Sequence, residues 1–360
     1  MAGLESAFPA ALRAGGGGSP PAAHSPVVLA AAATGIVEQI ERRGGDIDSI
    51  FGNTGVSPAM AGSPTLPIKL ACFCRLFEEA AHRTGDGNFG LWFGNQFRPH
   101  DLGLWGYLAV SSPTLGGALR NIVETFPFHQ QHSLLRLAPR GDGLLMLQYQ
   151  IRAPDIVERR QDAELSLGMF LNIFRECLGR GWTPETVYFE HPRPLDADEH
   201  EAAFGAPAYF SQPTNALVFR PDVLEHPMPR RDPRMMAMMH ACLEALGSKA
   251  DDFEPLIDRV RIAVRTRLPE GWPSLEAIGE DLRLSPASIQ RELARVGLTY
   301  KGLVQTVRRE LASAYLRQGH LPLSEIAFLL GYSELSAFSR AVRRWTGHSP
   351  KMIRSRLLDG

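Results

Sequence analysis

The side chains best suited to chemistry lie near the C-terminus, in the stretch IAFLLGYSELSAFSRAVRRWTGHSP that covers residues 326–350. A short apolar helix is expected to run into a turn at Gly331, and a second helix to follow it, with Ser324 and Ser333 as the caps of the two helices. Serines and arginines then recur along the outer side of the second helix. These side chains donate hydrogen bonds to base edges and phosphates, so the helix is suited to a groove of DNA.

The same plan occurs once more upstream, in SLEAIGEDLRLSPASIQRELARVG (residues 274–297). Ser285 is expected to cap the second helix of this unit, with Pro286 at its first position and Gly297 at its close. Between the two units, KGLVQTVRRELASAYLRQG predicts one long helix that buries Leu303, Val307, Leu311 and Leu316 and ends at Gly319. The sequence therefore predicts two helix-turn-helix units on one connecting helix.

Charge is distributed unevenly along the 360 residues. Residues 259–360 carry 17 Lys and Arg against 9 Asp and Glu, a net charge of +8, whereas the remaining residues carry 21 and 30, a net charge of −9. The length alone favours two domains. A cationic last third behind an acidic front indicates a polyanionic partner for the last third only.

Other chemistry finds little support in the sequence. The four cysteines are too few and too scattered for a disulfide framework, and the Cys72-Phe-Cys74 stretch lacks the spacing of a zinc site. There is no GxSxG, HExxH or Gly-rich phosphate loop, so we expect no enzyme, no catalytic residue, no metal and no cofactor. The apolar run at residues 27–33 is far short of the roughly 20 residues that a membrane span needs, and we expect a cytoplasmic, nucleoid-associated protein.

The front of the chain reads as an α+β domain. Helical periodicity places Leu66, Leu70, Phe73 and Phe77 on one face, and a serine and a proline begin another helix with Leu115, Leu119, Ile122 and Phe126 inside. A third helix puts Met169, Phe170, Ile173, Phe174 and Cys177 on one side. The segment SLLRLAPRGDGLLMLQYQI predicts a β-hairpin, and TVYFEHP and NALVFRP predict short strands. We expect a disordered tail over residues 1–25, this domain over 26–230, a linker over 231–251 and a DNA-binding domain over 252–360.

The last hundred or so residues resemble the AraC/XylS-type transcription regulators. The resemblance is carried by Ile326, Ala327, Leu330, Gly331, Tyr332, Glu334, Ser336, Phe338, Arg340, Arg343, Gly347, Ser349, Pro350 and Arg354. Val342 stands where the family usually has phenylalanine, and Ile353 where an aromatic residue is common. Both are apolar replacements that leave the fold intact. The resemblance implies an all-α domain that binds double-stranded promoter DNA.

The front domain resembles the arabinose-binding-type effector and dimerisation domain found in ornithine-utilisation and related regulators. Its motifs are TGDGNFGLWFGNQFRPHDLGLWGYLAVSSPTLGGALR, FEHPRP, FGAPAYFSQPTNALVF and LEHPMPRRDP, and the resemblance spans roughly residues 28–230. It implies a homodimer controlled by a small-molecule effector, and, for an activator, contact with RNA polymerase. The domain's historical name does not imply that arabinose is the ligand.

Base-facing positions follow from the helical faces together with the resemblance. They are Ala287, Gln290 and Arg291 in the first unit, and Leu335, Ser336, Ser339 and Arg340 in the second. Glutamine pairs with adenine, arginine with guanine, and leucine touches a thymine methyl. Arg343 and Arg344, joined by Lys351 and Arg354, are expected to contact phosphates, although exposed arginines are often merely solvated. Trp345 is assigned to the core.

Candidate effector contacts fall in two places. Arg98, His100, Trp105 and Tyr107 combine a cation with aromatic rings, which suits a carboxylate-bearing metabolite, but the stretch would equally serve as a turn that braces the core. His129 and His132 are three residues apart and would share one face of a helix, a spacing compatible with a metal. No third ligand is apparent, and paired histidines of a surface or pocket remain the alternative.

These residues leave three functions to distinguish. The first is a DNA-binding transcription regulator, expected to be an activator, whose effector changes dimerisation or the placement of its DNA-binding domains. The second is an effector-independent dimeric regulator whose front domain only dimerises. The third, an enzyme fused to a DNA-binding module, lacks the reactive cysteine cluster or nucleophile motif that it would need.

Overall fold

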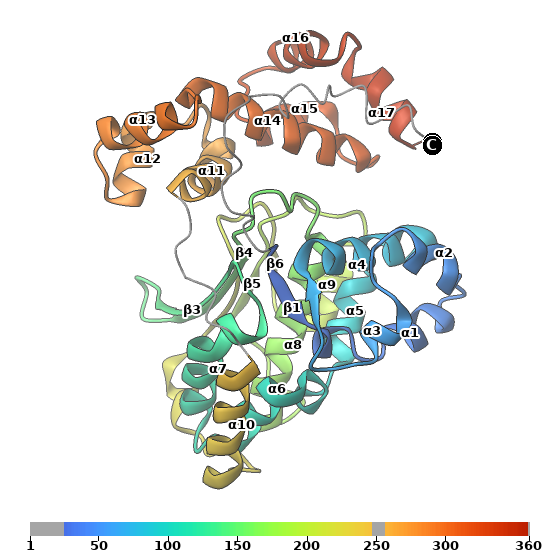
Figure 1. Ribbon diagram of the computed structural model, residues 1–360, viewed down its shortest axis with the longest axis vertical. Coiled ribbons are helices and arrows are strands. Elements are labelled where there is room, and N and C mark those ends of the chain that lie inside the picture. The colour runs from blue at the N-terminus through green and yellow to red at the C-terminus, as the bar shows by residue number, and fades with distance from the viewer. Residues whose placement is uncertain (1–24, 247–255, 359–360) are drawn as a thin grey trace. The chain divides into compact units, whose positions relative to one another are not determined.

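The computed structural model describes residues 25–246 and 256–358, which form two compact units with these bounds (Figure 1). The first unit combines helices with two sheets, and every regular element described in the second is helical. The expected α+β domain followed by an all-α domain is thus confirmed. The tail expected to be disordered lies outside the described residues, apart from Ser25.

The first unit holds seven strands, ten α-helices and three short 3₁₀ turns among its described residues. The strands are β1 (Val27–Leu29), β2 (Pro67–Lys69), β3 (Ser133–Pro139), β4 (Leu145–Ile151), β5 (Thr186–Tyr188), β6 (Ala208–Tyr209) and β7 (Asn215–Phe219). The helices are α1 (Ile36–Arg42), α2 (Ile47–Gly52), α3 (Pro58–Ala61), α4 (Leu70–Thr84), α5 (Phe89–Gln96), α6 (Gly103–Ser111), α7 (Leu115–His129), α8 (Arg160–Leu178), α9 (Asp198–Phe204) and α10 (Pro233–Leu246). The turns are η2 (Ala30–Ala33), η3 (Pro99–Leu102) and η4 (Pro221–Glu225).

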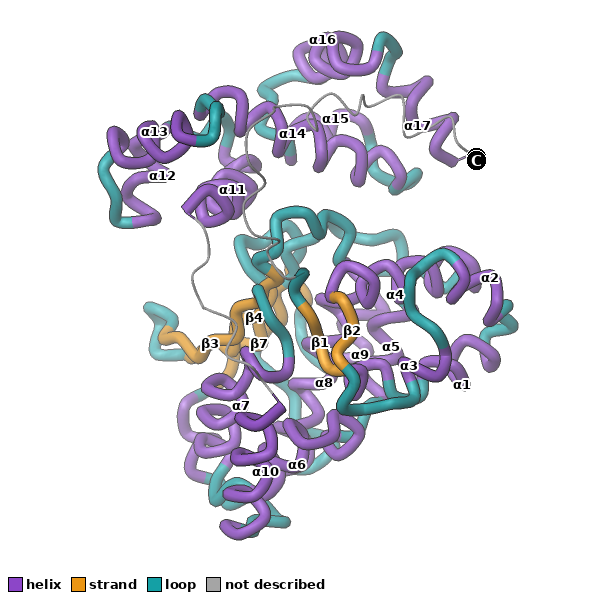
Figure 2. The backbone as a smooth tube through the Cα atoms, in the orientation of Figure 1, coloured by secondary structure: helices purple, strands orange, loops and turns teal. Residues whose placement is uncertain are grey.

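Five strands form the main sheet, in the order β3-β4-β7-β5-β6. Figure 2 shows the strands in orange, with β3, β4 and β7 of this sheet labelled. All neighbours are antiparallel except β5 and β6, which run parallel. The crossover between β5 and β6 contains α9, because parallel neighbours cannot be joined by a tight turn. β3 and β4 form the expected hairpin around the RGDG turn, with Leu135 opposite Tyr149. The strands expected in TVYFEHP and NALVFRP are β5 and β7. β1 and β2 pair separately.

Helix α8 is the central element of the first unit and packs against α5, β4 and β7. The backbones of α5 and α8 approach so closely that only glycine fits between them. A Cβ at Gly90 would lie 2.3 Å from the carbonyl oxygen of Gln161, and one at Gly94 would lie 2.2 Å from that of Leu165. From the other side, a Cβ at Gly168 would lie 2.7 Å from the backbone nitrogen of Asn95. The two helices are therefore in direct backbone contact at their crossing.

The expected inward faces of α4, α7 and α8 are largely confirmed. Leu70, Phe73 and Phe77 are buried, as are Leu115, Leu119, Ile122 and Phe126, and then Met169, Phe170, Ile173 and Phe174. Leu66 is an exception, because it precedes β2 and is exposed instead of belonging to α4. The start of α7 also differs. Its cap is Thr114, whose side-chain oxygen accepts from the N–H of Gly117, rather than the upstream serine and proline.

Helix α10 belongs to the first unit. It packs against α6 and α7, with Met239 and Leu243 buried. Asp232 begins it, its carboxylate accepting from the backbone N–H groups of Arg234 and Met235. The linker expected over residues 231–251 is therefore wrong for residues 233–246. This Met-rich segment is a helix whose apolar face packs against neighbouring helices and is not exposed to solvent.

The second unit is an assembly of seven α-helices among its described residues. They are α11 (Leu256–Arg267), α12 (Leu275–Leu282), α13 (Pro286–Arg295), α14 (Tyr300–Arg317), α15 (Leu323–Leu329), α16 (Leu335–Thr346) and α17 (Pro350–Leu358), with the turn η5 (Leu268–Glu270) after α11. Figure 1 shows α14 running between the pair α12–α13 and the pair α15–α16. Leu303, Val307, Leu311 and Leu316 are buried along it, as expected. Across both described parts of the chain, no helix has the length and apolar character required to cross a lipid bilayer.

Candidate nucleic-acid interface

The first helix-turn-helix unit consists of α12 and α13, and side-chain caps fix both helix starts. The Ser274 hydroxyl accepts a hydrogen bond from the N–H of Ala277 at the start of α12. Ser285 accepts from the N–H of Ser288 at the start of α13, and Pro286 occupies the first helical position, as expected. The sharp entry into α13 is therefore specified locally.

Helix α13 has one buried and one exposed face. Ile289 and Leu293 are buried against the rest of the unit, whereas Ala287, Gln290 and Arg291 are exposed. The structure thus brings the three side chains expected to face bases onto one accessible surface. The helical period was sufficient to predict which side of this short amphipathic helix is exposed, whereas the base-facing role of that side came from the resemblance.

In the second helix-turn-helix unit, α15 and α16, the helices begin at other residues than expected. Helix α15 follows Pro322, whose extended backbone takes the cap position, so Ser324 lies inside the helix. Helix α16 follows Glu334, which makes no side-chain cap with the described residues, and Ser333 lies one position too early. The capping roles expected for Ser324 and Ser333 are therefore wrong, although both helices are present.

The turn between α15 and α16 depends on Gly331. Its φ of +70° favours glycine, and a Cβ there would lie 2.5 Å from the carbonyl oxygen of Gly271 and 2.6 Å from that of Leu268. Arg308, on α14, donates from Nη2 to the carbonyl oxygen of Gly331 at 2.7 Å. The turn of the second helix-turn-helix unit is thus packed against the segment that follows α11.

Arg308 also contacts two aromatic rings, one in the segment before α12 and one in the turn before α16. Its guanidinium carbon lies 4.7 Å from the ring centroid of Trp272 and 4.3 Å from that of Tyr332. Arginine over an aromatic face is attractive, most of all where water is excluded, and Arg308 is buried. Burial lowers the pKa of Arg308. The connecting helix therefore holds the segment before α12 and the turn before α16 through one side chain.

Helix α16 repeats the division of faces. Phe338, Ala341 and Val342 are buried; Leu335, Ser336 and Arg340 are exposed, and Ser339 is half-buried. Val342, which replaces the phenylalanine common in the family, packs fully inside. The four expected base-facing residues lie on the outer side of the helix, with Ser339 nearest its edge.

Arg340 is held over the start of its own helix. Its Nη1 donates to the Ser336 hydroxyl at 3.2 Å, and Nη2 pairs with Oε1 of Glu334 at 3.3 Å. The hydrogen bond from Ser336, followed by that from Arg340, holds the pKa of the exposed Glu334 carboxyl below its usual value. The guanidinium is thereby oriented, and a base or phosphate must compete with the carboxylate for it.

A group of cations continues beyond the outer face of α16. Arg343, Arg344 and Lys351 are exposed. Arg354 is half-buried, and its burial lowers its pKa, so it is less accessible than the other three. Trp345, assigned to the core from sequence, is also half-buried.

The effector candidates of the first unit are divided between core and surface. Trp105 is buried, and its ring stacks on that of His129 with the centroids 4.7 Å apart. Burial lowers the pKa of His129 to about 4. The expected shared helical face of His129 and His132 is wrong, because α7 ends at His129 and His132 has a left-handed backbone with φ of +49°.

The remaining candidates lie on the surface around η3. Arg98 is exposed and pairs with Asp101, whose carboxylate also accepts from the backbone N–H of Arg98 at the start of η3. His100 lies edge-on to Tyr107, with the centroids 5.1 Å apart, and its Nε2 is 3.1 Å from Nη1 of Arg230. The four candidates of this stretch are therefore not one group, since Trp105 points into the core.

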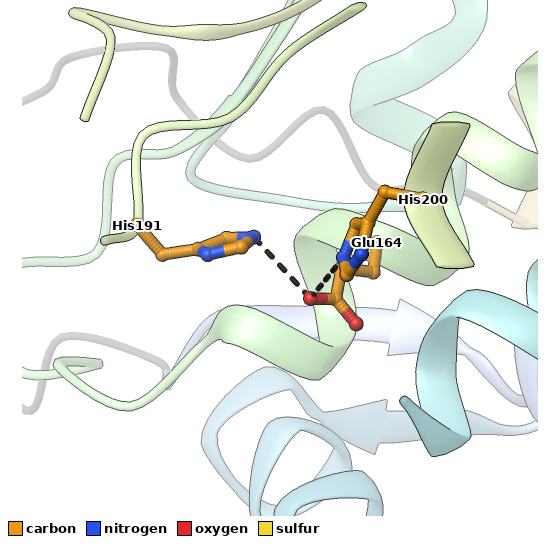
Figure 3. A group of neighbouring side chains, drawn as sticks. All are labelled: Glu164, His191 and His200. Atoms are coloured by element: carbon orange, nitrogen blue, oxygen red, sulfur yellow. Dashed lines mark hydrogen bonds and ion pairs between the residues drawn. The ribbon is translucent and has the colours of Figure 1, made fainter. Parts of the chain in front are cut away.

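A buried group that the sequence reasoning missed lies elsewhere in the first unit. Glu164 on α8, His191 after β5 and His200 on α9 bring their side chains together (Figure 3). The Nε2 atoms of His191 and His200 lie 3.4 Å and 2.9 Å from Oε1 of Glu164. Burial alone would raise the pKa of Glu164, but Arg160 and His200 outweigh it and lower that pKa to about 2. Burial lowers the pKa of His191 to about 4, although Glu164 acts the other way.

Comparison with known proteins assigns both units to families. Residues 44–228 match the arabinose-binding N-terminal domain of AraC transcription regulators, and residues 278–356 match a helix-turn-helix domain family. The Ornithine utilization regulator of Pseudomonas aeruginosa is 30% identical over 322 residues, covering 89% of this chain and 94% of its own. The regulator VirS of Mycobacterium tuberculosis is 30% identical over 292 residues, covering 80% and 84%. The crystal structure of CdpR, a transcriptional regulator from Pseudomonas aeruginosa, is 23% identical and covers 74% of this chain and 86% of its own, with a TM-score of 0.37.

Proposed function

The chain belongs to the AraC family of transcription regulators, and on that basis we propose that it reads promoter DNA with both helix-turn-helix units under the control of a small molecule. Both domain families and the similar proteins are those of DNA-binding regulators, not enzymes. The finer assignments, namely the contact residues, the effector, the dimer and activation, are proposals.

The observation that carries the proposal is the matched exposure of α13 and α16. Each follows a tight turn, buries an apolar face and leaves small polar and basic side chains accessible. We propose that Ala287, Gln290 and Arg291 read bases from α13, and that Leu335, Ser336, Ser339 and Arg340 read bases from α16. Such side chains match the donor and acceptor pattern of the major groove. Arg343, Arg344, Lys351 and Arg354 are assigned to phosphates, which position the protein without reading sequence.

The connecting helix supports simultaneous binding of two grooves. Helix α14 has 18 residues and is therefore about 27 Å long at ~1.5 Å per residue. Successive major grooves on one face of a duplex are about 34 Å apart. A helix of this length, flanked by one helix pair near each end, suits a spacing of one helical turn of DNA.

The first unit is assigned to effector binding and dimerisation. We propose a carboxylate-bearing metabolite as the effector, and the name of the similar Ornithine utilization regulator makes amino acids the first compounds to test. Of the six candidate residues, His100 and Tyr107 are adjacent and accessible, with Arg98 nearby. Trp105 and His129 would act only through the core. The regulator is proposed to be a homodimer that acts in the cytoplasm at the nucleoid, and as an activator it would contact RNA polymerase.

Selection from a random duplex pool tests DNA reading, and a metabolite panel tests control. The full chain should enrich a defined sequence and bind it with a Kd of about 10⁻⁸–10⁻¹¹ M at physiological salt. One carboxylate-bearing metabolite should raise the melting temperature of the chain and change its affinity for the selected duplex or its output in transcription with RNA polymerase. Sequence-specific binding without any effect of a metabolite would favour an effector-independent dimer. Failure to enrich any sequence would refute the proposal.

A further inference from the structure

The group formed by Glu164, His191 and His200 joins three elements of the first unit. Glu164 comes from α8, His191 from the segment after β5, and His200 from α9. All three side chains are buried, and one ligand atom from each lies within 4.8 Å of the others. Figure 3 shows both imidazoles directed at the same carboxylate. This group belongs to the first unit, whereas the helices proposed to read bases belong to the second.

The hydrogen bonds leave two acceptors facing each other. Nδ1 of His191 lies 2.9 Å from the carbonyl oxygen of Pro192, which can only accept, so Nδ1 carries the proton. In the neutral ring Nε2 is then an acceptor, and it lies 3.4 Å from Oε1 of Glu164, another acceptor. Oε1 of Glu164 also accepts from Nε of Arg160 and lies 2.9 Å from Nε2 of His200. Among the described residues, His191 Nε2, His200 Nδ1 and Glu164 Oε2 have no hydrogen-bond partner. Buried acceptors without a donor are costly unless a cation lies between them.

We propose that Glu164, His191 and His200 bind one divalent transition-metal ion, with Zn²⁺ as the first candidate. Two imidazoles and a carboxylate form a ligand set typical of zinc and its neighbours in the first transition row, whereas Mg²⁺ and Ca²⁺ prefer oxygen alone. The His191 ring is already oriented, because its second nitrogen donates to a backbone carbonyl, as metal-bound histidines commonly do. Three protein ligands leave a further position for water or a small molecule.

Arg160 is the cation that opposes such an ion most directly. Its Nε donates to Oε1 of Glu164 at 2.7 Å, and its Nη2 donates to Oδ1 of Asn88 at 2.7 Å. The carboxylate has a second oxygen, Oε2, so it is able to accept from Arg160 with one oxygen and bind the ion with the other. Arg160 then orients the carboxylate while weakening the affinity for the ion through charge repulsion.

Metal binding by the intact chain tests the site. The full protein, purified without a histidine tag and stripped with a chelator, is titrated with Zn²⁺ by calorimetry and with Co²⁺ by absorption. We expect one ion per chain, a Co²⁺ spectrum with nitrogen ligation, and a rise in melting temperature of about 5–10 °C at Zn²⁺ a hundredfold above Kd. These readouts do not depend on DNA, so failure here leaves the proposed function untouched.

Two substitutions at the site and one matched control locate the ion. His191→Gln and Glu164→Gln should abolish the saturable binding, whereas His82→Gln removes an exposed histidine of the same domain and should keep one ion per chain. Arg160→Gln should bind the ion more tightly than the wild type, a result that loss of packing alone would not produce.

Three results would overturn the proposal. They are the absence of saturable binding by the folded wild type, retention of the ion by both folded site variants, and a Co²⁺ spectrum without nitrogen ligation. The wild-type spectrum decides the question even where a site variant fails to fold. If the folded wild type shows no saturable binding, a proton shared between His191 and Glu164 would account for the group instead.

Discussion

The guanidinium carbon of Arg308 lies 4.3 Å from the ring centroid of Tyr332, and Nη2 of Arg308 donates to the carbonyl oxygen of Gly331. Arg308 belongs to the connecting helix and Tyr332 to the turn that sets the direction of α16. Because Trp272 also contacts the guanidinium, this side chain fixes the turn before α16 relative to the connecting helix α14.

Replacing Arg308 should destabilise the second helix-turn-helix unit and weaken DNA binding. Arg308→Leu leaves the Gly331 carbonyl without this donor and removes both ring contacts, at a cost of about 2–4 kcal/mol. Arg308→Lys should recover little, because an ammonium has no planar face to stack while it donates. Hydrogen exchange of segments 300–346 in the full chain measures the effect. Arg309→Leu is the control, and equal exchange in the two leucine variants would contradict the assignment.

A pair of glycines separates crowding from backbone strain. Gly331 and Gly347 have nearly the same φ, +70° and +76°. A Cβ at Gly331 would meet two carbonyl oxygens, whereas a Cβ at Gly347 would meet no atom of the described residues within 4 Å. Gly347→Ala should cost about 1 kcal/mol through the left-handed backbone alone. Gly331→Ala should cost clearly more and displace the turn. Urea unfolding of both variants measures the difference, and equal costs would show that the close approach is unimportant.

Base reading should be sensitive to Arg340 and Arg291. Each alanine substitution is expected to weaken binding to the selected duplex by about 1–3 kcal/mol and to relax the preference at its own position. Fluorescence anisotropy with the selected duplex and single-base variants measures both effects. Arg193→Ala, an exposed arginine of the first unit paired with Asp198, is the control. Wild-type affinity in both test variants would refute the assignment of the reading helices.

Phosphate contacts should appear in the salt dependence of binding. Arg343→Gln and Arg344→Gln are each expected to reduce the slope of log Kd against log salt by about 1, with the sequence preference unchanged. Arg267→Gln is the control, because Arg267 is already paired with Asp281 and Glu270. A slope that changes only in the control variant would place the DNA on another face.

The stability of the first unit should fall in mild acid because of His129. Burial lowers the pKa of His129 to about 4, so between about pH 6.5 and 4 the unfolded chain takes up a proton that the folded chain does not. The contribution of neutral His129 to the free energy of unfolding is therefore fully present above pH 6.5 and is lost as the pH falls toward 4. His129→Phe keeps a ring over Trp105 and removes the proton, so its stability should fall less steeply, by up to about 1.4 kcal/mol per pH unit. Urea unfolding at several pH values checks this, and equal slopes would contradict it.

The paired helix-turn-helix plan could be predicted because short-range rules specify it. Ser285 and Pro286 fix the start of α13 within four residues, and Ile289 and Leu293 fix its inner face. The same rules failed for Ser324 and Ser333, because Pro322 and Glu334 already take the cap positions. Ser324 lies two residues after its cap and Ser333 one residue before its cap, so neither serine caps its helix. Local rules rank residues that can cap a helix, but the backbone path decides which of them does.

Long-range contacts explain what the sequence could not supply. Glu164, His191 and His200 lie on separate segments, and only the packing of α8 and α9 around the sheet brings them together. The spacing of three residues predicted a shared helical face for His129 and His132 instead, but α7 ends at His129 and the two rings are separated. Likewise the apolar face of α10 indicated a helix, but not that α6 and α7 would cover it.

The crossing of α5 and α8 has a consequence for how this sequence can diverge. The atoms that a larger residue at 90, 94 or 168 would strike belong to the main chain of the opposite helix, not to a side chain. No second substitution can shorten a peptide group, so no compensating partner mutation exists for any of the three positions. Their glycines can be lost only together with the crossing itself.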